Sequence, residues 1–293
     1  MPDGWGVWKG LGVAVVCLRL DDVHGGTPVD LLRMLDKRVW AGRPVTLGVI
    51  PFPARGCLGA AGTLREIPGV SRRSLADEGL RAYLEARSSD GAAEVAVHGV
   101  THADHRSAGG PAVAELVAPS AARVAWLLRE LDGFRARFGG ATLIPPHNFL
   151  DAEVEERCLA AGFHISRAVM SDEVARLGLD PRSAGARAEA KRLRPWYAAG
   201  AGLVVYQSAA VWAEPVRRLG GSPEAQAVVV MDVVRPAGVG VVTFHWWDFL
   251  SRDGRVDEES AGFAARFLAA CERLGAEEFS TVPALARQLG AHE

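Results

Sequence analysis

Cysteine is scarce in this sequence, and no two cysteines are close enough to form a C-x-x-C pair. The four cysteines are Cys17, Cys57, Cys158 and Cys271. Their wide spacing argues against a zinc–cysteine site and against a disulfide framework. Free thiols are typical of proteins from a reducing compartment, so we expect all four to be unpaired.

Long apolar runs are also missing, since no stretch approaches the roughly 20 residues that a membrane-spanning helix needs. An apolar run from Leu11 to Leu18 follows Lys9, but it is short and no small-residue cleavage site comes after it. Asp21 and Asp22 follow almost at once, so we interpret the run as a buried strand rather than a signal peptide. We therefore expect a cytoplasmic protein without a membrane partner.

Neither sign of charge is in excess, because 33 Lys and Arg residues face 35 Asp and Glu residues, for a net charge of −2. Proteins that bind nucleic acid usually have a basic excess, so we expect no nucleic-acid partner. Apolar residues make up 49% of the 293-residue chain, which is enough to bury a large core. The sequence does not indicate an oligomeric state.

Short apolar runs alternate with longer amphipathic segments along the chain. The runs are continuous, as expected for parallel strands that are buried on both faces. We expect strands at Val13–Leu20, Val45–Ile50, Ala93–His98, Thr142–Ile144, His164–Ile165, Leu203–Tyr206 and Val239–His245. Between them, apolar residues at helical spacing predict helices. These helices are expected at Pro28–Trp40 (with Thr27 as N-cap), Ser120–Phe138, Asp151–Ala161, Ser222–Val234 and Asp257–Leu274.

This alternation predicts an α/β fold in which a parallel sheet is surrounded by helices. About seven strands over this length favour a distorted (β/α) barrel, which we expect to form a single domain over residues 1–293. Two segments are irregular, Pro51–Ser74 and Met170–Pro195. We expect both to be loops at the mouth of the barrel, where substrates are usually selected.

Polar residues stand where several of the predicted strands end. Asp21 and Asp22 follow the first strand, and carboxylates at the carboxyl end of a barrel strand face the usual active site. A polar turn after the strand is the alternative for this pair. Two histidines four residues apart, His98 and His102, can meet one metal ion if the chain turns helically after His98. With His105, three of the eight histidines fall within eight residues, which favours a metal site over a polar loop.

Two further strand ends carry candidate residues. Pro145 and Pro146 form a stiff pair before His147 and Asn148, and they fix the direction of the next backbone N–H groups, which can serve an oxyanion hole. A plain strand-to-helix turn capped by Asn148 is the alternative. The last strand ends at His245, which two tryptophans follow and which can act as a general acid in a partly desolvated pocket. A core aromatic cluster around a hydrogen-bonded histidine is the alternative there.

The order of these motifs resembles that of the polysaccharide deacetylase superfamily, the NodB-like carbohydrate esterases of family four. Leu20-Asp21-Asp22 matches the first motif, and His98 with His102 matches the second, although the usual Ser or Thr stands at Thr101. The closest resemblance is to an uncharacterised bacterial branch of deacetylase-like proteins. It extends over roughly residues 13 to 250, and it implies a distorted barrel of about seven strands.

The resemblance also implies a site. Asp22, His98 and His102 would bind one divalent ion. Zn²⁺ is the main candidate, and Co²⁺, Ni²⁺, Mn²⁺ and Fe²⁺ are the alternatives. Asp21 would be the catalytic base that takes a proton from a water activated by the ion, and His245 the general acid. Residues that would contact the substrate or its oxyanion are Pro146, His147, Asn148, Trp246 and Trp247. Asp104 or His105 would orient a ligand histidine from outside the first coordination sphere.

The implied activity is the hydrolytic removal of an acetyl group from a sugar or sugar-containing small molecule. An N-acetyl group is expected before an O-acetyl group. The sequence departs from the family at Ile144, which stands where an Arg usually steadies the catalytic Asp. The family's fourth motif has no clear match, and Trp196, Gln207 and Trp212 are its candidates. Two alternatives remain open: a cyclic-amide hydrolase of the same fold, and a carbohydrate-binding relative without catalysis.

Overall fold

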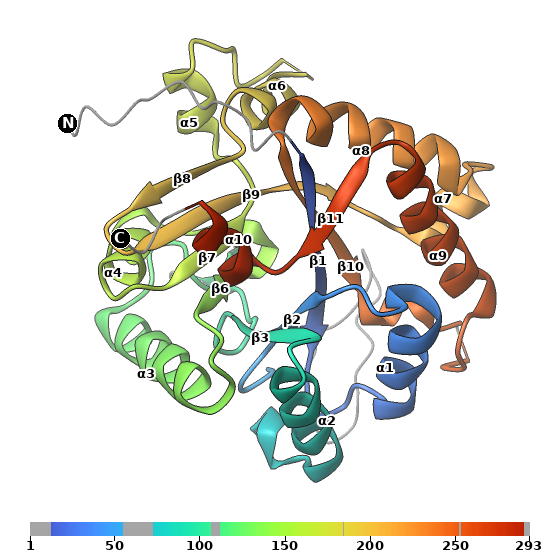
Figure 1. Cartoon of the computed structure of the whole chain (residues 1–293). Helices are drawn as coiled ribbons and strands as arrows, with labels where there is room; N and C mark the ends of the chain where they lie inside the picture. Colours follow the sequence, from blue (N-terminus) through green and yellow to red (C-terminus); the bar gives the residue numbers. More distant parts are fainter. Residues whose placement is uncertain (1–12, 55–72, 107–111, 184, 252, 290–293) are drawn as a thin grey trace.

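Seven parallel strands close into a barrel in the computed structural model, which describes residues 13–54, 73–106, 112–183, 185–251 and 253–289 (Figure 1). The strands are β1 (Ala14–Val23), β2 (Val45–Val49), β3 (Ala93–His98), β6 (Thr142–Ile144), β7 (His164–Arg167), β9 (Gly202–Ala210) and β10 (Val239–His245). They are neighbours in this order, and pairing of β10 with both β9 and β1 closes the ring. The predicted (β/α) barrel of about seven strands is confirmed.

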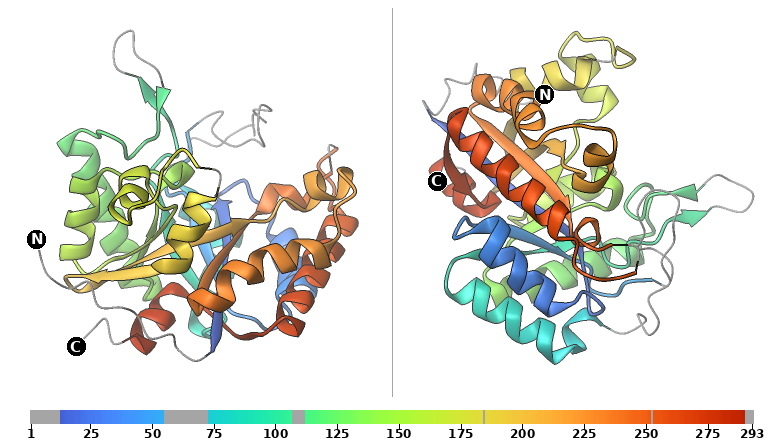
Figure 2. Two further views of the ribbon diagram at one scale, coloured as in Figure 1. Left: turned by 90° about the horizontal axis from the view of Figure 1, so that it is seen from above. Right: turned by 90° about the vertical axis from the view of Figure 1, so that its right-hand side faces the viewer.

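Four short strands were not predicted. β8 (Trp196–Ala199) runs antiparallel to β9, and β11 (Ala276–Ser280) pairs with the beginning of β1. β4 (His105–Arg106) and β5 (Ala112–Val113) form a separate two-stranded ribbon. Figure 2 shows this ribbon projecting away from the barrel.

Helices surround the barrel (Figures 1 and 2). They are α1 (Val29–Leu35), α2 (Glu78–Ser89), α3 (Ala121–Phe138), α4 (Ala152–Ala160), α5 (Ser171–Arg176), α6 (Ala186–Leu193), α7 (Ala213–Arg218), α8 (Pro223–Ala237), α9 (Glu258–Arg273) and α10 (Val282–Gln288). All five predicted helices are present, α1 continuing as a π-helical turn to Trp40. Thr27 is not the N-cap of α1: Pro28 holds that position, and the Thr27 hydroxyl accepts a hydrogen bond from His24 N–H instead.

The two irregular segments differ from the prediction. Met170–Pro195 is not a plain loop, because it contains α5 and α6. Most of Pro51–Ser74 lies outside the described residues, as does Cys57. The cysteines that the structure describes, Cys17, Cys158 and Cys271, are buried and free. Within the described ranges, no helix has the length and apolar character that crossing a bilayer requires.

The barrel has one apolar end and one polar end. Val15, Cys17 and Val205 belong to an interior cluster that includes Val282 and Leu285 of α10. α10 therefore packs against the interior at the amino-terminal end of the strands, as Figure 1 shows. The carboxyl ends of the strands, where Asp22, His98 and His245 stand, are left to form the site.

Candidate metal centre

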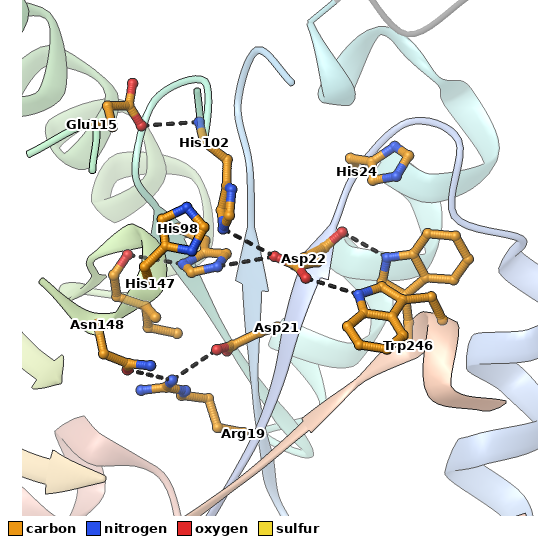
Figure 3. A network of polar contacts seen from close by, with 12 residues as sticks. Arg19, Asp21, Asp22, His24, His98, His102, Glu115, His147, Asn148 and Trp246 are labelled. Atoms are coloured by element: carbon orange, nitrogen blue, oxygen red, sulfur yellow. Dashed lines mark hydrogen bonds and ion pairs between the residues drawn. The ribbon is translucent and has the colours of Figure 1, made fainter. Parts of the chain in front are cut away.

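The end of β1 brings two adjacent carboxylates to the mouth of the barrel. Pairing with β2 shifts register between Leu20 and Val23, and Asp22 has φ +65°, a left-handed conformation that Asp tolerates better than most residues. Such an irregularity re-aims side chains that would otherwise alternate. Asp21 is directed at Arg19, and Asp22 is directed at the histidines (Figure 3).

Asp22, His98 and His102 form a compact buried cluster. The Nε2 atoms of His98 and His102 lie 3.1 and 3.3 Å from the same carboxylate oxygen, Oδ1 of Asp22. Two ligand atoms each about 2.1 Å from a tetrahedral ion lie about 3.4 Å apart, so this donor set fits one divalent ion. Among the described residues, these three are the group whose ligand atoms lie close enough to hold a metal, all within 4.8 Å.

The second histidine reaches the cluster by a loop and not by the expected helical turn. His98 is the last residue of β3, and φ is +64° at Gly99 and +57° at His102. Both residues are left-handed, which folds the chain back on itself instead of continuing as a right-handed helix. The rings of His98 and His102 consequently meet edge to face, with their centroids 4.8 Å apart.

Hydrogen bonding and charge prepare the cluster for a cation. His98 Nδ1 lies 3.0 Å from the carbonyl oxygen of Ile144, which fixes a proton on Nδ1, so a cation would take the place of the proton on Nε2. Burial disfavours the charge on Asp22, but the hydrogen bond from His98 and the nearby imidazoles outweigh it and hold its pKa well below the usual range. Burial lowers the pKa of His102 to about 4, so this ring is neutral at neutral pH.

Both tryptophans after β10 donate their indole N–H groups to Asp22. Trp247 Nε1 lies 2.9 Å from Oδ2 of Asp22, and Trp246 Nε1 lies 2.7 Å from its carbonyl oxygen. Oδ2 is thereby engaged, and Oδ1 remains the oxygen that faces the histidines (Figure 3). Trp246 is buried, whereas Trp247 is partly exposed.

Arg19 holds the other carboxylate, and sequence reasoning missed it. Its guanidinium donates to Asp21 Oδ2 at 2.7 Å and to Asn148 Oδ1 at 2.8 Å, and it bonds the Ser166 hydroxyl at 3.0 Å. A guanidinium therefore lies beside Asp21 although Ile144 occupies the place where the resemblance led us to look for one. The available signal was an arginine two residues before Asp21 in an apolar strand, a spacing that puts both side chains on one face.

His245 ends β10 directly across from Asp21 in the strand pairing. Its ring stacks against two indoles, 4.5 Å from the centroid of Trp212 and 5.0 Å from that of Trp247, and the two indoles lie 5.3 Å from each other. Burial lowers the pKa of His245, against the opposing charges of Asp22 and Asp21. Trp212, one of the fourth-motif candidates, thus contacts the expected general acid.

The remaining candidates lie on the rim. His147, at φ +54°, is exposed, and its ring centroid is 4.8 Å from that of His102. Asp104 lies 3.1 Å from Nε2 of His147, so the structure pairs it with this residue and not with a ligand histidine. His105 belongs to β4, and its side chain lies outside the described residues.

The turn after β6 is not capped by Asn148. Asn148 instead accepts the hydrogen bond from Arg19, and the side chain of Asp151 caps α4 by accepting from Glu153 N–H. Pro146 is buried against the loop Gly99–His102, the metal loop, since a Cβ added to Gly99 would lie 2.4 Å from Cγ of Pro146. The turn therefore connects Asp21, through Arg19, with the loop that carries His102.

A pocket of about 610 Å³ lies elsewhere, lined by residues of α4, β7, α5, β8 and β9. Arg167 at its wall is almost fully buried and pairs with Glu155 and Glu173. Tyr206 also bonds Glu173. These groups satisfy one another, and the three residues of the metal cluster are not among those that line this pocket.

No protein-family model matches the chain, and no curated protein sequence matches it. Several solved structures are similar to the chain. A family 4 carbohydrate esterase pseudoenzyme from Bacillus anthracis has 12% identity and a TM-score of 0.47, and the alignment covers 93% of this chain and 65% of that one. A 4-alpha-glucanotransferase from Thermococcus litoralis has 12% identity and a TM-score of 0.53, with 94% of this chain and 40% of that one covered.

The third is a family 4 carbohydrate esterase from Streptomyces lividans in complex with acetate, with 14% identity, a TM-score of 0.39 and 93% of each chain covered. The chain thus spans less than two thirds of the length of the first two structures. At these identities the likeness concerns the fold, and of these three structures the glucanotransferase alone exceeds a TM-score of 0.5. What these comparisons show is that the chain adopts a barrel architecture found in solved structures.

Proposed function

We propose that the chain is a metal-dependent hydrolase that removes an acetyl group, N-acetyl above all, from a sugar or sugar-containing small molecule. The observation that carries this proposal is the buried Asp22–His98–His102 cluster at the carboxyl ends of the barrel strands. Asp21 adjoins the cluster on β1, and His245 lies across from Asp21 on β10. Two carboxylates, two ligand histidines and a third histidine are the groups that such a hydrolysis requires.

Asp22, His98 and His102 would hold the ion. When bound, Zn²⁺, or Co²⁺, Ni²⁺, Mn²⁺ or Fe²⁺ in its place, polarises a carbonyl and makes water a better nucleophile. Asp21 is the base in this proposal, and its two oxygens have different tasks. Oδ2 is held by Arg19, whereas Oδ1 has no hydrogen-bond partner among the described residues, so Oδ1 is the atom that accepts the water proton.

His245 donates a proton to the leaving amine or alcohol. Stacking against Trp212 and Trp247 fixes the plane of its ring, so its nitrogens point along a set direction. Because burial lowers its pKa, the protonated ring releases its proton readily. Trp212 and Trp247 are partly exposed and offer aromatic surface for a sugar ring.

The rigid turn Pro146–Asn148 offers its backbone to the oxyanion of the reaction. We further propose that the protein acts in the cytoplasm, because its described cysteines are free. In that compartment a soluble or activated sugar is a more accessible substrate than a wall polymer.

The test is acetate release by zinc-loaded protein from a panel of N- and O-acetylated sugars, with cyclic amides included. Wild type should release acetate, and Asp21→Asn should retain its metal while turnover falls by about 10²–10⁴-fold, because the base is lost. Asp132→Asn, on the exposed side of α3, is the matched control and should behave as wild type. Zinc-loaded wild type that cleaves only cyclic amides, or nothing, would contradict the proposal.

A further inference from the structure

The segment Gly99–His102 that joins the two histidine ligands wraps around one carboxylate, that of Glu115 (Figure 3). Oε2 of Glu115 accepts hydrogen bonds from the N–H groups of Val100 and His102 at 3.0 and 2.9 Å. Oε1 accepts from Thr101 twice, from its N–H at 2.9 Å and from its hydroxyl at 2.8 Å. The Glu115 side chain is only 1% exposed.

Three consecutive N–H groups that converge in this way form a concavity that binds anions. The conformation that creates it is unfavourable by itself, because His102 is a non-glycine residue with φ +57°. Without an acceptor, the N–H groups of Val100 and His102 would also be buried and unsatisfied. The loop shape that delivers His102 therefore depends on an anion at this point, and Glu115 supplies it.

The fit of this carboxylate is tight. A Cβ added to Gly99 would lie 2.5 Å from Oε2 of Glu115 and 2.4 Å from Cγ of Pro146. Only a residue without a side chain allows the carboxylate and the proline ring to approach the backbone so closely. Glu115, Gly99 and Pro146 thus fix the loop from two sides.

The charge of Glu115 is compensated inside the same structure. Arg123, in the first turn of α3, donates to Oε1 at 2.9 Å. A buried charge is costly unless such a partner, together with hydrogen bonds, compensates it. The metal loop is in this way attached to α3 through a single carboxylate.

We propose that Glu115 is a positioning residue for metal binding. It acts through the backbone, holding residues 100–102 so that Nε2 of His102 stands 3.3 Å from Oδ1 of Asp22. The inference rests on the proposed function to the extent that it takes the Asp22–His98–His102 cluster to bind a divalent ion. It requires no hydrolytic activity, and its test is a binding constant.

The experiment measures the Zn²⁺ dissociation constant by competition with a chromophoric chelator. Glu115→Gln keeps the size of the side chain but removes the charge and replaces one acceptor oxygen with an amide group that cannot accept from N–H. The dissociation constant should rise by about 10–100-fold, the usual effect of losing a group that orients a ligand. Glu94→Gln, a buried glutamate near the other end of β3, is the matched control and should bind Zn²⁺ as wild type does.

A structural role alone would lower the melting temperature of Glu115→Gln while the folded variant bound Zn²⁺ normally, and this result would overturn the proposal. If Glu115→Gln does not fold, Thr101→Val tests the same contact, because it keeps the shape and removes one donor to Oε1. The dissociation constant of Thr101→Val should rise about fivefold, and an unchanged value would overturn the proposal.

The two proposals fail in different ways. Wild type that binds Zn²⁺ but releases no acetate contradicts the proposed function, whereas the weakened binding of Glu115→Gln would still support the positioning role. Wild type that binds no Zn²⁺ contradicts both. Wild type that is active, with an equally tight site in Glu115→Gln, contradicts the positioning role alone.

Discussion

At the scale of single residues, the ion pair between Arg19 and Asp21 determines how the second carboxylate of the site is held. The two side chains are 1% and 3% exposed, and their closest atoms are 2.7 Å apart. Removing one member of a buried pair leaves the other charge without a partner, which is far more costly than removing both. The pair therefore couples the geometry of Asp21, the proposed base, to the stability of the barrel.

Arg19→Met is expected to lower the free energy of unfolding by about 3–5 kcal/mol at pH 7, because Asp21 would be buried without compensation. The double variant Arg19→Met/Asp21→Asn should lose clearly less than the sum of the two single losses. Urea unfolding of the four proteins measures this coupling. Strictly additive losses would show that the pair does not interact as the structure indicates.

At the scale of elements, the strands were predictable because buried parallel strands have continuous apolar sequences. Val45–Ile50 and Val239–His245 were predicted within a residue of β2 and β10. β11 was missed because two glutamates interrupt its apolar residues, and α2 was missed because its apolar residues are few. Periodicity arguments need a long buried face, which neither element has.

The position of the candidate site was predictable as well, whereas some of its contacts were not. Motifs at strand ends meet because parallel strands deliver their carboxyl ends to one face of the barrel, and Asp22, His98 and His102 are indeed together. Arg19 was missed although its spacing from Asp21 was a local signal, and its contact with Ser166, 147 residues away, has no sequence signal at all. Glu115 was missed because no motif connects it with the N–H groups of Val100 and His102. A left-handed residue such as His102 has no reliable local signal.

The loop after β3 provides a test at this scale. Gly99→Ala should weaken Zn²⁺ binding by more than about tenfold, because the new Cβ would collide with Pro146 and Glu115 and displace the loop. Gly91→Ala is the matched control, since Gly91 has φ +71° but open space around it. Both substitutions place alanine at a positive φ, so equal Zn²⁺ affinities of the two variants in a competition assay would contradict the role of close packing.

At the scale of the whole molecule, the barrel separates a polar end from an apolar one, and Glu94 is an exception within the apolar part. It lies near the amino-terminal end of β3, is 7% exposed and accepts a hydrogen bond from the Thr46 hydroxyl at 3.0 Å. Burial raises its pKa to about 7, against the opposing effect of Thr46. The folded protein therefore retains a proton that the unfolded chain releases at lower pH.

This shift predicts how stability depends on pH. A carboxyl whose pKa rises from 4.5 to about 7 on folding contributes stability that is lost as pH rises between these values. Glu94→Gln mimics the protonated form, so it should match wild type near pH 4.5 and exceed it by on the order of 3 kcal/mol above pH 7.5. Urea unfolding across this range measures the difference, and a difference independent of pH would refute the prediction.

The central claim is that Asp22, His98 and His102 bind one divalent ion, and metal content tests it most directly. Elemental mass spectrometry would be applied to wild type and His98→Ala after exposure to Zn²⁺, Ni²⁺ or Co²⁺. His164→Gln, which alters a buried histidine of β7, serves as the control. Wild type and the control should hold about one equivalent and His98→Ala almost none. A wild type without metal, or equal metal in His98→Ala, would contradict the account.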